Sequence, residues 1–486
     1  MKPKFKENIQ IHGNYQCEIK QNFNFSSKQK KKYFIDTYIF FPHSLNVNEQ
    51  SYTKEDFYKD LSTNIRLKTP KIPLDKLKDD VVFNRIQESI DELERDNSVV
   101  IFKNFRYQIK MFTMIFKKAM DRQIDGVRES NIFKDASNLT GDFIKSTYST
   151  IESYRALQKR MTQPEIGDNF KNIYFYGDEY LSLKIESSAI KLYQFFDKSK
   201  YSKSKTSKLK TQLIKTINSE INYRKEHNYP AVATDQNSET FLYRMSLLKK
   251  YLSNILFLET YVKRDGKVVE QIIYSIAAGL AMLFATAVAF IGENQYGKLT
   301  LPFFIALIIS YMFKDRMKEL LRIYFTVGMK NYLYDRKRYL FHSFKQKIGI
   351  CKESFNYVPR DKIPKDIIEL RHKENISSLE KKQIEEKIIH YRKMISLSPK
   401  AFKLIRKKYI TEGVIDIVRI NVETFLKNMD NPEKKVFMLK KNKLISKSVD
   451  RVYHINMITK YFDGNHEELK HFRLILNRNG IIRIEE

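Results

Sequence analysis

The chain is poor in cysteine, glycine and proline, and it has no tryptophan. Its 486 residues include 2 cysteines, 14 glycines and 11 prolines. So few cysteines exclude a disulfide-stapled scaffold and a cysteine-rich zinc array. The low glycine and proline contents exclude a collagen-like or low-complexity chain. A hydrophobic content of 42% excludes a chain that is mostly disordered, and the length admits two or three folded units.

The sequence also lacks the common catalytic motifs. It contains no G-x-x-x-x-G-K-[ST] or G-x-G-x-x-G phosphate loop, no G-x-S-x-G elbow and no H-E-x-x-H helix. Cys17 and Cys351 have no histidine beside them and are expected to be ordinary thiols. The potential metal ligands are densest near residue 466, but we interpret this stretch as a polar loop between strands and not as a metal site. The residues are His454, Asp463, His466, Glu467, Glu468 and His471. We therefore expect no metal, no cofactor and a non-enzymatic role.

The charge balance is strongly basic. Lysine and arginine number 88 against 57 acidic residues, a net charge of +31. Such an excess favours polyanionic neighbours, namely anionic lipid, nucleic acid or acidic protein. Lysine supplies 64 of the 88 basic residues, and asparagine, isoleucine, phenylalanine and tyrosine are frequent. This bias is typical of an AT-rich, bacterial genome, so codon usage is an alternative source of the charge. Arginine, the better residue for bidentate phosphate recognition, is not enriched.

Two long apolar runs lie near the middle of the chain. The first, Ile272 to Ile291, has 20 residues and no charge, and as a helix it is about 30 Å long, the thickness of a bilayer core. The second, Leu299 to Phe313, has 15 residues between Lys298 and Lys314, whose side chains can snorkel. The sequence predicts a two-helix transmembrane hairpin, with a re-entrant or interfacial second segment as the alternative.

The flanking charges orient this hairpin. Basic residues precede the first run and follow the second, whereas the connector holds only Lys298; they are Lys249, Lys250, Lys263, Arg264, Lys267, Lys314, Arg316, Lys318 and Arg322. The positive-inside rule then places both termini in the cytoplasm. We expect a two-pass protein of the cytoplasmic membrane, with the first run as its insertion signal because no signal peptide is recognisable at the N-terminus.

Small residues recur along the first apolar run at intervals that allow close helix packing. They are Ser275, Gly279, Ala281, Ala285 and Ala289. Small side chains let two helix backbones approach closely in a membrane. The pattern predicts packing against the second run of the same chain, and a homo-oligomer is the alternative.

The fold class predicted is an α+β membrane protein in three parts. Residues 1–238 are expected to form an N-terminal cytosolic domain that opens with a β-hairpin, Ile9–Phe25 and Tyr33–Phe41, and is then mainly helical. Residues 239–345 are expected to hold the transmembrane hairpin between two helices that pair as a stalk. Residues 346–486 are expected to form a C-terminal cytosolic α+β domain rich in strands, because the apolar period changes to two from Val414.

Two β-hairpins are expected within the C-terminal part. Apolar runs flank residues 440–443, and two more flank the dipeptide Asn479-Gly480. An Asn-Gly pair between alternating apolar runs is the strongest short-range hairpin signal.

A lysine tract near residue 200 is the most suggestive binding feature. It comprises Lys198, Lys200, Lys203, Lys205, Lys208, Lys210 and Lys215, interleaved with serine and threonine as in a mobile loop. In a membrane protein it would attract the anionic inner leaflet. Nucleic-acid contact through phosphates is the second interpretation, and a solvated loop without a ligand is the third.

These observations favour a membrane-anchored protein for recognition, scaffolding or signalling. Its partners are expected to be the lipid bilayer and, through the lysine tract, anionic lipid or nucleic acid. The alternatives are a membrane-bound enzyme with a site between the cytosolic domains and a membrane tether for nucleic acid.

Overall fold

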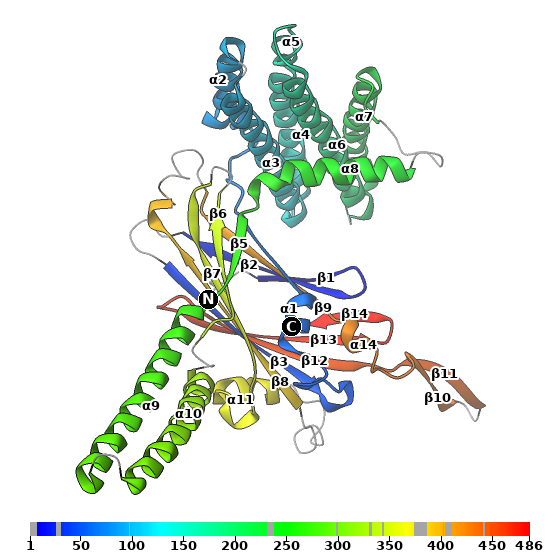
Figure 1. The fold of residues 1–486 in the computed structure, drawn as a ribbon. Coiled ribbons are helices and arrows are strands. Elements are labelled where there is room, and N and C mark those ends of the chain that lie inside the picture. Colours follow the sequence, from blue (N-terminus) through cyan, green and yellow to red (C-terminus); the bar gives the residue numbers. More distant parts are fainter. Residues whose placement is uncertain are drawn as a thin grey trace. The chain divides into compact units, whose positions relative to one another are not determined.

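The computed structural model describes most of the chain in two units (Figure 1). The described residues are 7–25, 31–96, 98–199, 201–230, 238–297, 300–329, 333–342, 345–373, 386–401, 403, 411–440 and 443–486. Contacts within the chain define a sheet unit, residues 1–64, 259–402 and 416–486, and a helical unit, residues 65–258 and 403–415.

These units differ from the three contiguous segments that the sequence predicts. The N-terminal strand Lys31–Pro42 (β3) pairs with Glu386–Leu397 (β8) and Tyr453–Phe462 (β12). Strands from both ends of the chain therefore share one sheet, so residues 1–64 belong with the C-terminal part. Pairing over several hundred residues leaves no local signal in the sequence, which is why a contiguous N-terminal domain was expected.

The sheet unit is built on a large antiparallel sheet. Its order is β14-β13-β12-β3-β8-β7-β6-β5. The remaining strands of this sheet are Glu259–Arg264 (β5), Arg336–Phe341 (β6), Lys347–Tyr357 (β7), Glu467–Asn477 (β13) and Gly480–Glu485 (β14).

A second, four-stranded sheet has the order β1-β2-β9-β4. Its strands are Glu7–His12 (β1), Gln16–Asn24 (β2), Leu61–Leu67 (β4) and Gly413–Asn421 (β9). Alternate side chains of both sheets meet in one core, where Ile19 of β2 and Ile420 of β9 join Ile39 of β3 and Met457 of β12. Burying one face of each strand stabilises the two layers.

Short helices complete the sheet unit. They are His43–Leu45 (η1), Lys54–Asp60 (α1), Arg360–Lys362 (η4), Lys365–Lys373 (α11) and Glu423–Leu426 (α14). Ile367 of α11 packs with Tyr38 and Ile388 in a separate apolar cluster. Glu433–Lys440 (β10) and Lys443–Asp450 (β11) form a two-stranded hairpin.

The helical unit consists of long helices and short turns. Its elements are Leu77–Asp79 (η2), Val81–Arg95 (α2), Val99–Glu129 (α3), Phe133–Ala156 (α4), Gln158–Met161 (α5), Asp168–Lys198 (α6), Lys203–Glu226 (α7), Ser238–Ser253 (α8) and Asn254–Leu256 (η3). Asp80 caps α2 by accepting the backbone N–H of Val82. In the core the rings of Phe112, Tyr154 and Tyr174 stack from α3, α4 and α6.

A helical hairpin interrupts the large sheet between its last two strands. Lys267–Tyr296 (α9) follows β5, and Leu301–Met329 (α10) precedes β6. The two strands pair antiparallel, so Arg264 lies opposite Arg336. The backbone N–H of Asp265 donates to the carbonyl oxygen of Asp335 at 3.2 Å. Both ends of the helical hairpin are therefore held together at one edge of the sheet.

One helix in the described part of the chain is long and apolar enough to cross a membrane. It covers Val268–Gln295, with a mean hydropathy of 2.1 and only 17% of its most apolar window buried. A core helix of a soluble protein would be mostly covered. The apolar part of α10 is shorter, Leu301 to Phe313, because Lys314 follows.

Two local predictions need correction. The runs Ile9–Phe25 and Tyr33–Phe41 do not form a hairpin with each other, because β2 pairs with β1 while β3 pairs with β8 and β12. The flanks of the apolar segment do not form a helical stalk, because α8 ends at Ser253 and residues 259–264 pair as β5 with β6. The β-branched and aromatic residues of β5 suit a strand once a partner edge is present.

Other local predictions are confirmed. The hairpin around residues 440–443 is formed by β10 and β11, and the hairpin at Asn479-Gly480 is formed by β13 and β14. Residues 413–421 are a strand. The helical pattern of residues 81–226 is also correct.

Gly349 provides a test of how tightly β7 and β8 approach. A Cβ at this position would lie 2.3 Å from the carbonyl oxygen of Ser396, far inside contact distance. We expect Gly349→Ala to destabilise the sheet unit by roughly 2 kcal/mol, because the backbone must shift. Hydrogen exchange read by mass spectrometry should show lost protection in β7 and β8. Gly141→Ala in α4, where a Cβ meets nothing within 4 Å, is the matched control and should leave those strands unchanged.

Candidate functional site

The base of the helical hairpin is fixed by a network centred on Asp335. Its carboxylate accepts from Lys54 Nζ at 2.6 Å, Tyr58 Oη at 3.0 Å and the backbone N–H of Phe355 at 2.8 Å. On the other strand, Lys352 Nζ lies 2.7 Å from the carboxylate of Asp265. Charge-assisted hydrogen bonds of this kind are short and strongly directional. The two ends of the helical hairpin are therefore attached to the sheet and to α1.

The two helices of the hairpin pack through small residues. Ala277 and Ala281 of α9 are buried, and Ser310 Oγ of α10 donates to the carbonyl oxygen of Ala285 at 3.4 Å. At the base, the guanidinium of Arg322 lies 3.8 Å from the ring centre of Tyr274. This register places the apolar part of α10 beside the second half of the apolar run of α9.

The five small residues predicted to pack are not equivalent. Ala281 is buried, Ala285 and Ala289 are half-buried, and Ser275 and Gly279 are exposed. The three alanines therefore lie on the face of α9 that other residues of the chain cover. Ser275 and Gly279 lie outside the face of α9 that is covered within the chain.

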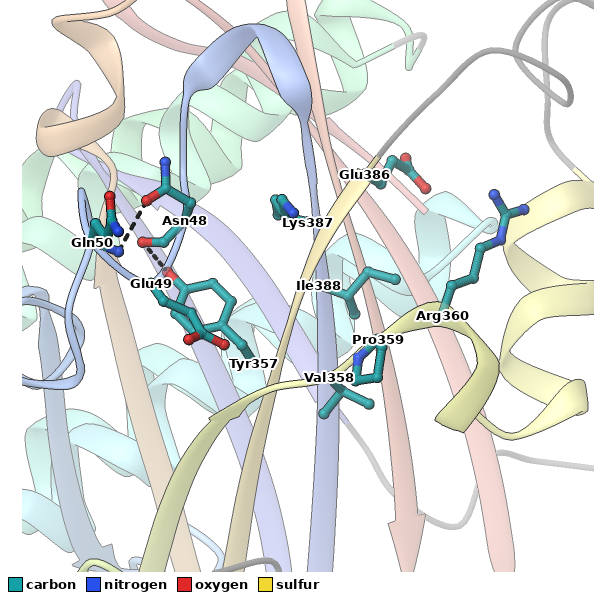
Figure 2. Close-up of a pocket in the computed structure, with 10 residues that line it drawn as sticks. All are labelled: Asn48, Glu49, Gln50, Tyr357, Val358, Pro359, Arg360, Glu386, Lys387 and Ile388. Carbon is teal, nitrogen blue, oxygen red and sulfur yellow. Dashed lines mark hydrogen bonds between the residues drawn. The ribbon is translucent and has the colours of Figure 1, made fainter. Parts of the chain in front are cut away.

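The sheet unit contains a groove of about 920 Å³ (Figure 2). Its walls come from the end of β7, the η4 turn, the start of β8 and the segment after η1. The hydroxyl group of Tyr357 donates to the backbone of the segment after η1. Its oxygen lies 3.0 Å from the carbonyl oxygen of Asn48 and 2.7 Å from that of Tyr52. Arg360 and Glu386 lie at the other side in Figure 2. The described lining residues are Asn48, Glu49, Gln50, Tyr357, Val358, Pro359, Arg360, Glu386, Lys387 and Ile388.

Charged side chains at the rim of this groove are paired within the sheet unit. Glu386 is paired with Arg371 at 2.6 Å, and Arg360 hydrogen-bonds His372 at 2.8 Å. Burial raises the pKa of Tyr357 above its ordinary value, so its phenol stays protonated. Its described lining includes no serine, cysteine or histidine. A mixed-charge groove of this size can hold a peptide segment or a small polar ligand.

A buried ionic cluster lies between the two sheets. Lys393 Nζ of β8 is 2.7 Å from the carboxylate of Asp416 on β9 and 3.8 Å from that of Glu353 on β7. Glu353 also accepts from Arg338 Nε at 2.9 Å and from Tyr391 Oη at 2.8 Å. All four neighbours belong to the sheet unit, so the cluster ties the layers together.

The electrostatics of this cluster favour the charged forms of Lys393 and Glu353, whereas burial raises the pKa of Asp416. Burial lowers the pKa of Lys393, but the carboxylates of Asp416 and Glu353 outweigh burial and raise it overall. Burial raises the pKa of Glu353, but Lys393 and Arg338 outweigh it and hold that pKa below its ordinary value. Each charge is satisfied inside the protein, which is the arrangement of a structural pair.

Beside the cluster is a cavity of about 30 Å³ with a mainly apolar lining. Gln21, Thr37 and Thr459 contribute polar groups to it together with Lys393 and Asp416. The side-chain amide of Gln21 is buried and has no partner among the described residues. A cavity of this size has room for a water molecule, which would hydrogen-bond that amide.

The lysine tract adopts a helix and not the loop that was predicted. Lys198 ends α6, and the five lysines from 203 to 215 lie on α7, whereas Lys200 lies outside the described residues. Lys203, Lys205, Lys208 and Lys215 are exposed, and Lys210 pairs with Asp197 at 2.6 Å. Serine and threonine did not break the helix, because Thr206, Leu209 and Leu213 bury one face.

The set of potential ligands near residue 466 is divided between different partners. Asp463 accepts the backbone N–H groups of Asn465 and His466 and pairs with Lys31 at 3.2 Å. His471 contacts Asn456 at 3.1 Å. Among the described residues, no group of three or more histidine, cysteine, aspartate or glutamate side chains is placed to hold a metal ion.

The chain has no match among protein-family models, curated proteins or solved structures.

The buried ionic cluster has a weak signal in the sequence that was not used. In β8, Lys393 occupies the same phase as Ile389, Tyr391 and Ile395, all of which are buried. A charge in the apolar phase of a strand indicates a buried ion pair or a site. The identity of its partners could not be read from the sequence, because they come from strands distant in the chain.

Paired substitution separates a structural role of this cluster from a functional one. Lys393→Met alone should lower the free energy of unfolding by about 3–5 kcal/mol, since it leaves Asp416 as an unpaired buried charge. Asp416→Leu alone should lower it by less, because Lys393 keeps the carboxylate of Glu353 at 3.8 Å. The double variant should recover most of that loss, because Glu353 keeps Arg338 and Tyr391. Urea unfolding of the three variants measures this. Additive losses would show that the two side chains do not act as a pair.

Proposed function

We propose that this protein is a membrane-anchored platform for recognition or scaffolding, held in the bilayer by the α9–α10 hairpin. The observation that carries the proposal is the exposed apolar surface of α9. Leu283 is 68% and Phe290 69% exposed, and no charge interrupts Ile272 to Ile291. Lipid would remove this surface from water, at roughly 25 cal/mol per Å².

The position of the hairpin in the sheet supports a two-pass topology. Because β5 and β6 pair, the chain must leave the membrane on the side where it entered. At 1.5 Å per residue, α9 and α10 are both about 45 Å long, so the second can return the full distance of the first. The flanking lysines and arginines favour the cytoplasm for that side.

The shorter apolar part of α10 is the least favourable feature of this topology. Leu301 to Phe313 spans about 20 Å, less than the bilayer core. Lys314 lies 3.6 Å from the ring centre of Tyr311, and its long side chain can snorkel toward the headgroups. Local thinning of the bilayer covers the remaining distance at a fraction of a kcal/mol per Å. A re-entrant hairpin in one leaflet is the competing arrangement.

The exposed lysines of α7 favour a polyanionic partner. Lys203, Lys205, Lys208 and Lys215 have no ion pair within the described part of the chain. In a membrane-anchored protein, anionic lipid is the partner nearest at hand, and each lysine near the surface contributes about 1 kcal/mol. Nucleic acid is the alternative partner. The mixed-charge groove of Figure 2 would serve a protein or small-molecule partner.

Cysteine labelling tests the topology. Single cysteines at Asn294, Ser204 and Asn479, all exposed positions, would be made after replacing Cys17 and Cys351, which are buried. In right-side-out vesicles, an impermeant maleimide should label Asn294→Cys alone. In inside-out vesicles it should label Ser204→Cys and Asn479→Cys.

Other labelling patterns would contradict specific parts of the proposal. Protection of Asn294→Cys from the outer side would replace the two-pass topology with a re-entrant hairpin. Outer labelling of Ser204→Cys or Asn479→Cys would refute the cytoplasmic placement of both units.

A further inference from the structure

The helical unit contains a pocket of its own. It has a volume of about 440 Å³ and lies among α3, α6 and α8. These three helices pack against one another, and Figure 1 shows α8 crossing the ends of the longer helices. A volume of 300–1,000 Å³ is typical of small-molecule sites.

Lysines from all three helices line this pocket. Lys117 comes from α3, Lys184 and Lys191 come from α6, and Lys249 comes from α8. Lys184 and Lys191 are two helical turns apart and so share a face of α6. Four lysines from three helices therefore line one pocket, whereas lysines on an ordinary protein surface are dispersed.

The described lining contains a single carboxylate for these four lysines. Asp121 lies 3.1 Å from Lys184 Nζ. Within the described part of the chain, Lys117, Lys191 and Lys249 make no ion pair. The pocket therefore has an excess of three positive charges.

The lysines disturb one another's protonation. Burial lowers the pKa of Lys117, and Lys184 and Lys249 lower it further against the opposing effect of Asp121. Lys184, followed by burial, lowers the pKa of Lys191. Crowding of like charges destabilises the empty pocket, and a bound anion would relieve that repulsion.

The remaining lining of the pocket is mainly apolar, and Ser187 and Ser246 add hydroxyl groups to it. Tyr180 and Leu183 of α6 are buried, and Leu242 and Met245 come from α8. A ligand that fits both walls carries a multiply charged anionic group and an apolar portion. Phosphate groups meet the first requirement, since they carry up to two negative charges and offer three acceptor oxygens.

We propose that this pocket is a binding site for a phosphate-bearing ligand, with Lys117, Lys184, Lys191 and Lys249 as its phosphate ligands. The ligand is either a soluble phosphorylated molecule or the headgroup of an anionic phospholipid. Both present the same chemistry to the lysines. Asp121 positions Lys184 and limits the affinity for anions.

Titration calorimetry on the full chain in neutral detergent at low salt tests the site. Inorganic pyrophosphate is the soluble probe, and dihexanoylphosphatidic acid, kept monomeric, is the lipid-headgroup probe. At least one should bind the wild-type chain. Binding of pyrophosphate alone identifies a soluble ligand, and binding of the lipid alone identifies a headgroup.

Variants in the pocket and outside it provide matched comparisons. Lys117→Gln with Lys191→Gln should weaken binding at least tenfold. Lys103→Gln with Lys145→Gln changes the net charge equally, at exposed positions on α3 and α4, and should change affinity less than twofold. Asp121→Asn should strengthen binding several-fold, a gain that misfolding cannot produce.

Three results would overturn the proposal. The first is failure of both probes to bind the wild-type chain at roughly 1 mM. The second is an equal loss of affinity in the pocket variant and in the Lys103–Lys145 variant, which would indicate diffuse attraction to surface charge. The third is weaker binding by Asp121→Asn.

Discussion

Antiparallel pairing of β5 with β6 holds the two ends of the α9–α10 hairpin together. β5 is the edge strand of the large sheet and β6 is its neighbour, and Asp335 at the base of the hairpin is bonded to Lys54, Tyr58 and the backbone of Phe355. The two ends of the insertion therefore cannot separate without breaking the sheet. For the membrane anchor that we propose, this attachment means that the chain enters and leaves the bilayer on one side.

The sheet that holds this insertion is stabilised by distant parts of the chain. β3 lies between β8 and β12, and Lys393 and Asp416 join β8 to β9 across the core. We expect this buried pair to contribute to the specificity of layer pairing more than to net stability. The sheet unit thus depends on segments from the beginning, middle and end of the sequence.

Local features were predictable from the sequence, and long-range pairing was not. The Asn479-Gly480 turn, the alternation in β9 and the apolar run of α9 each depend on neighbours within a few residues. The partner of β3 depends on residues several hundred positions away. Residues 259–264 are an example, because the sequence predicted a helix there and the structure has a strand that pairs with β6. The grouping of lysines in the α3–α6–α8 pocket could not be predicted from the sequence either, since these lysines come together only when three helices pack.

We propose that the α9–α10 hairpin is the membrane anchor and is separable from the sheet that carries it. Replacing residues 266–334 with Asn-Gly would join Asp265 to Asp335 by a two-residue turn suited to the existing β5–β6 register. Carbonate extraction of membranes from cells expressing each form is the direct measurement. We expect the intact chain to stay in the pellet and the shortened chain to appear folded in the supernatant. A shortened chain that stays in the carbonate-resistant pellet, or an intact chain that is extracted, would refute this role of the hairpin.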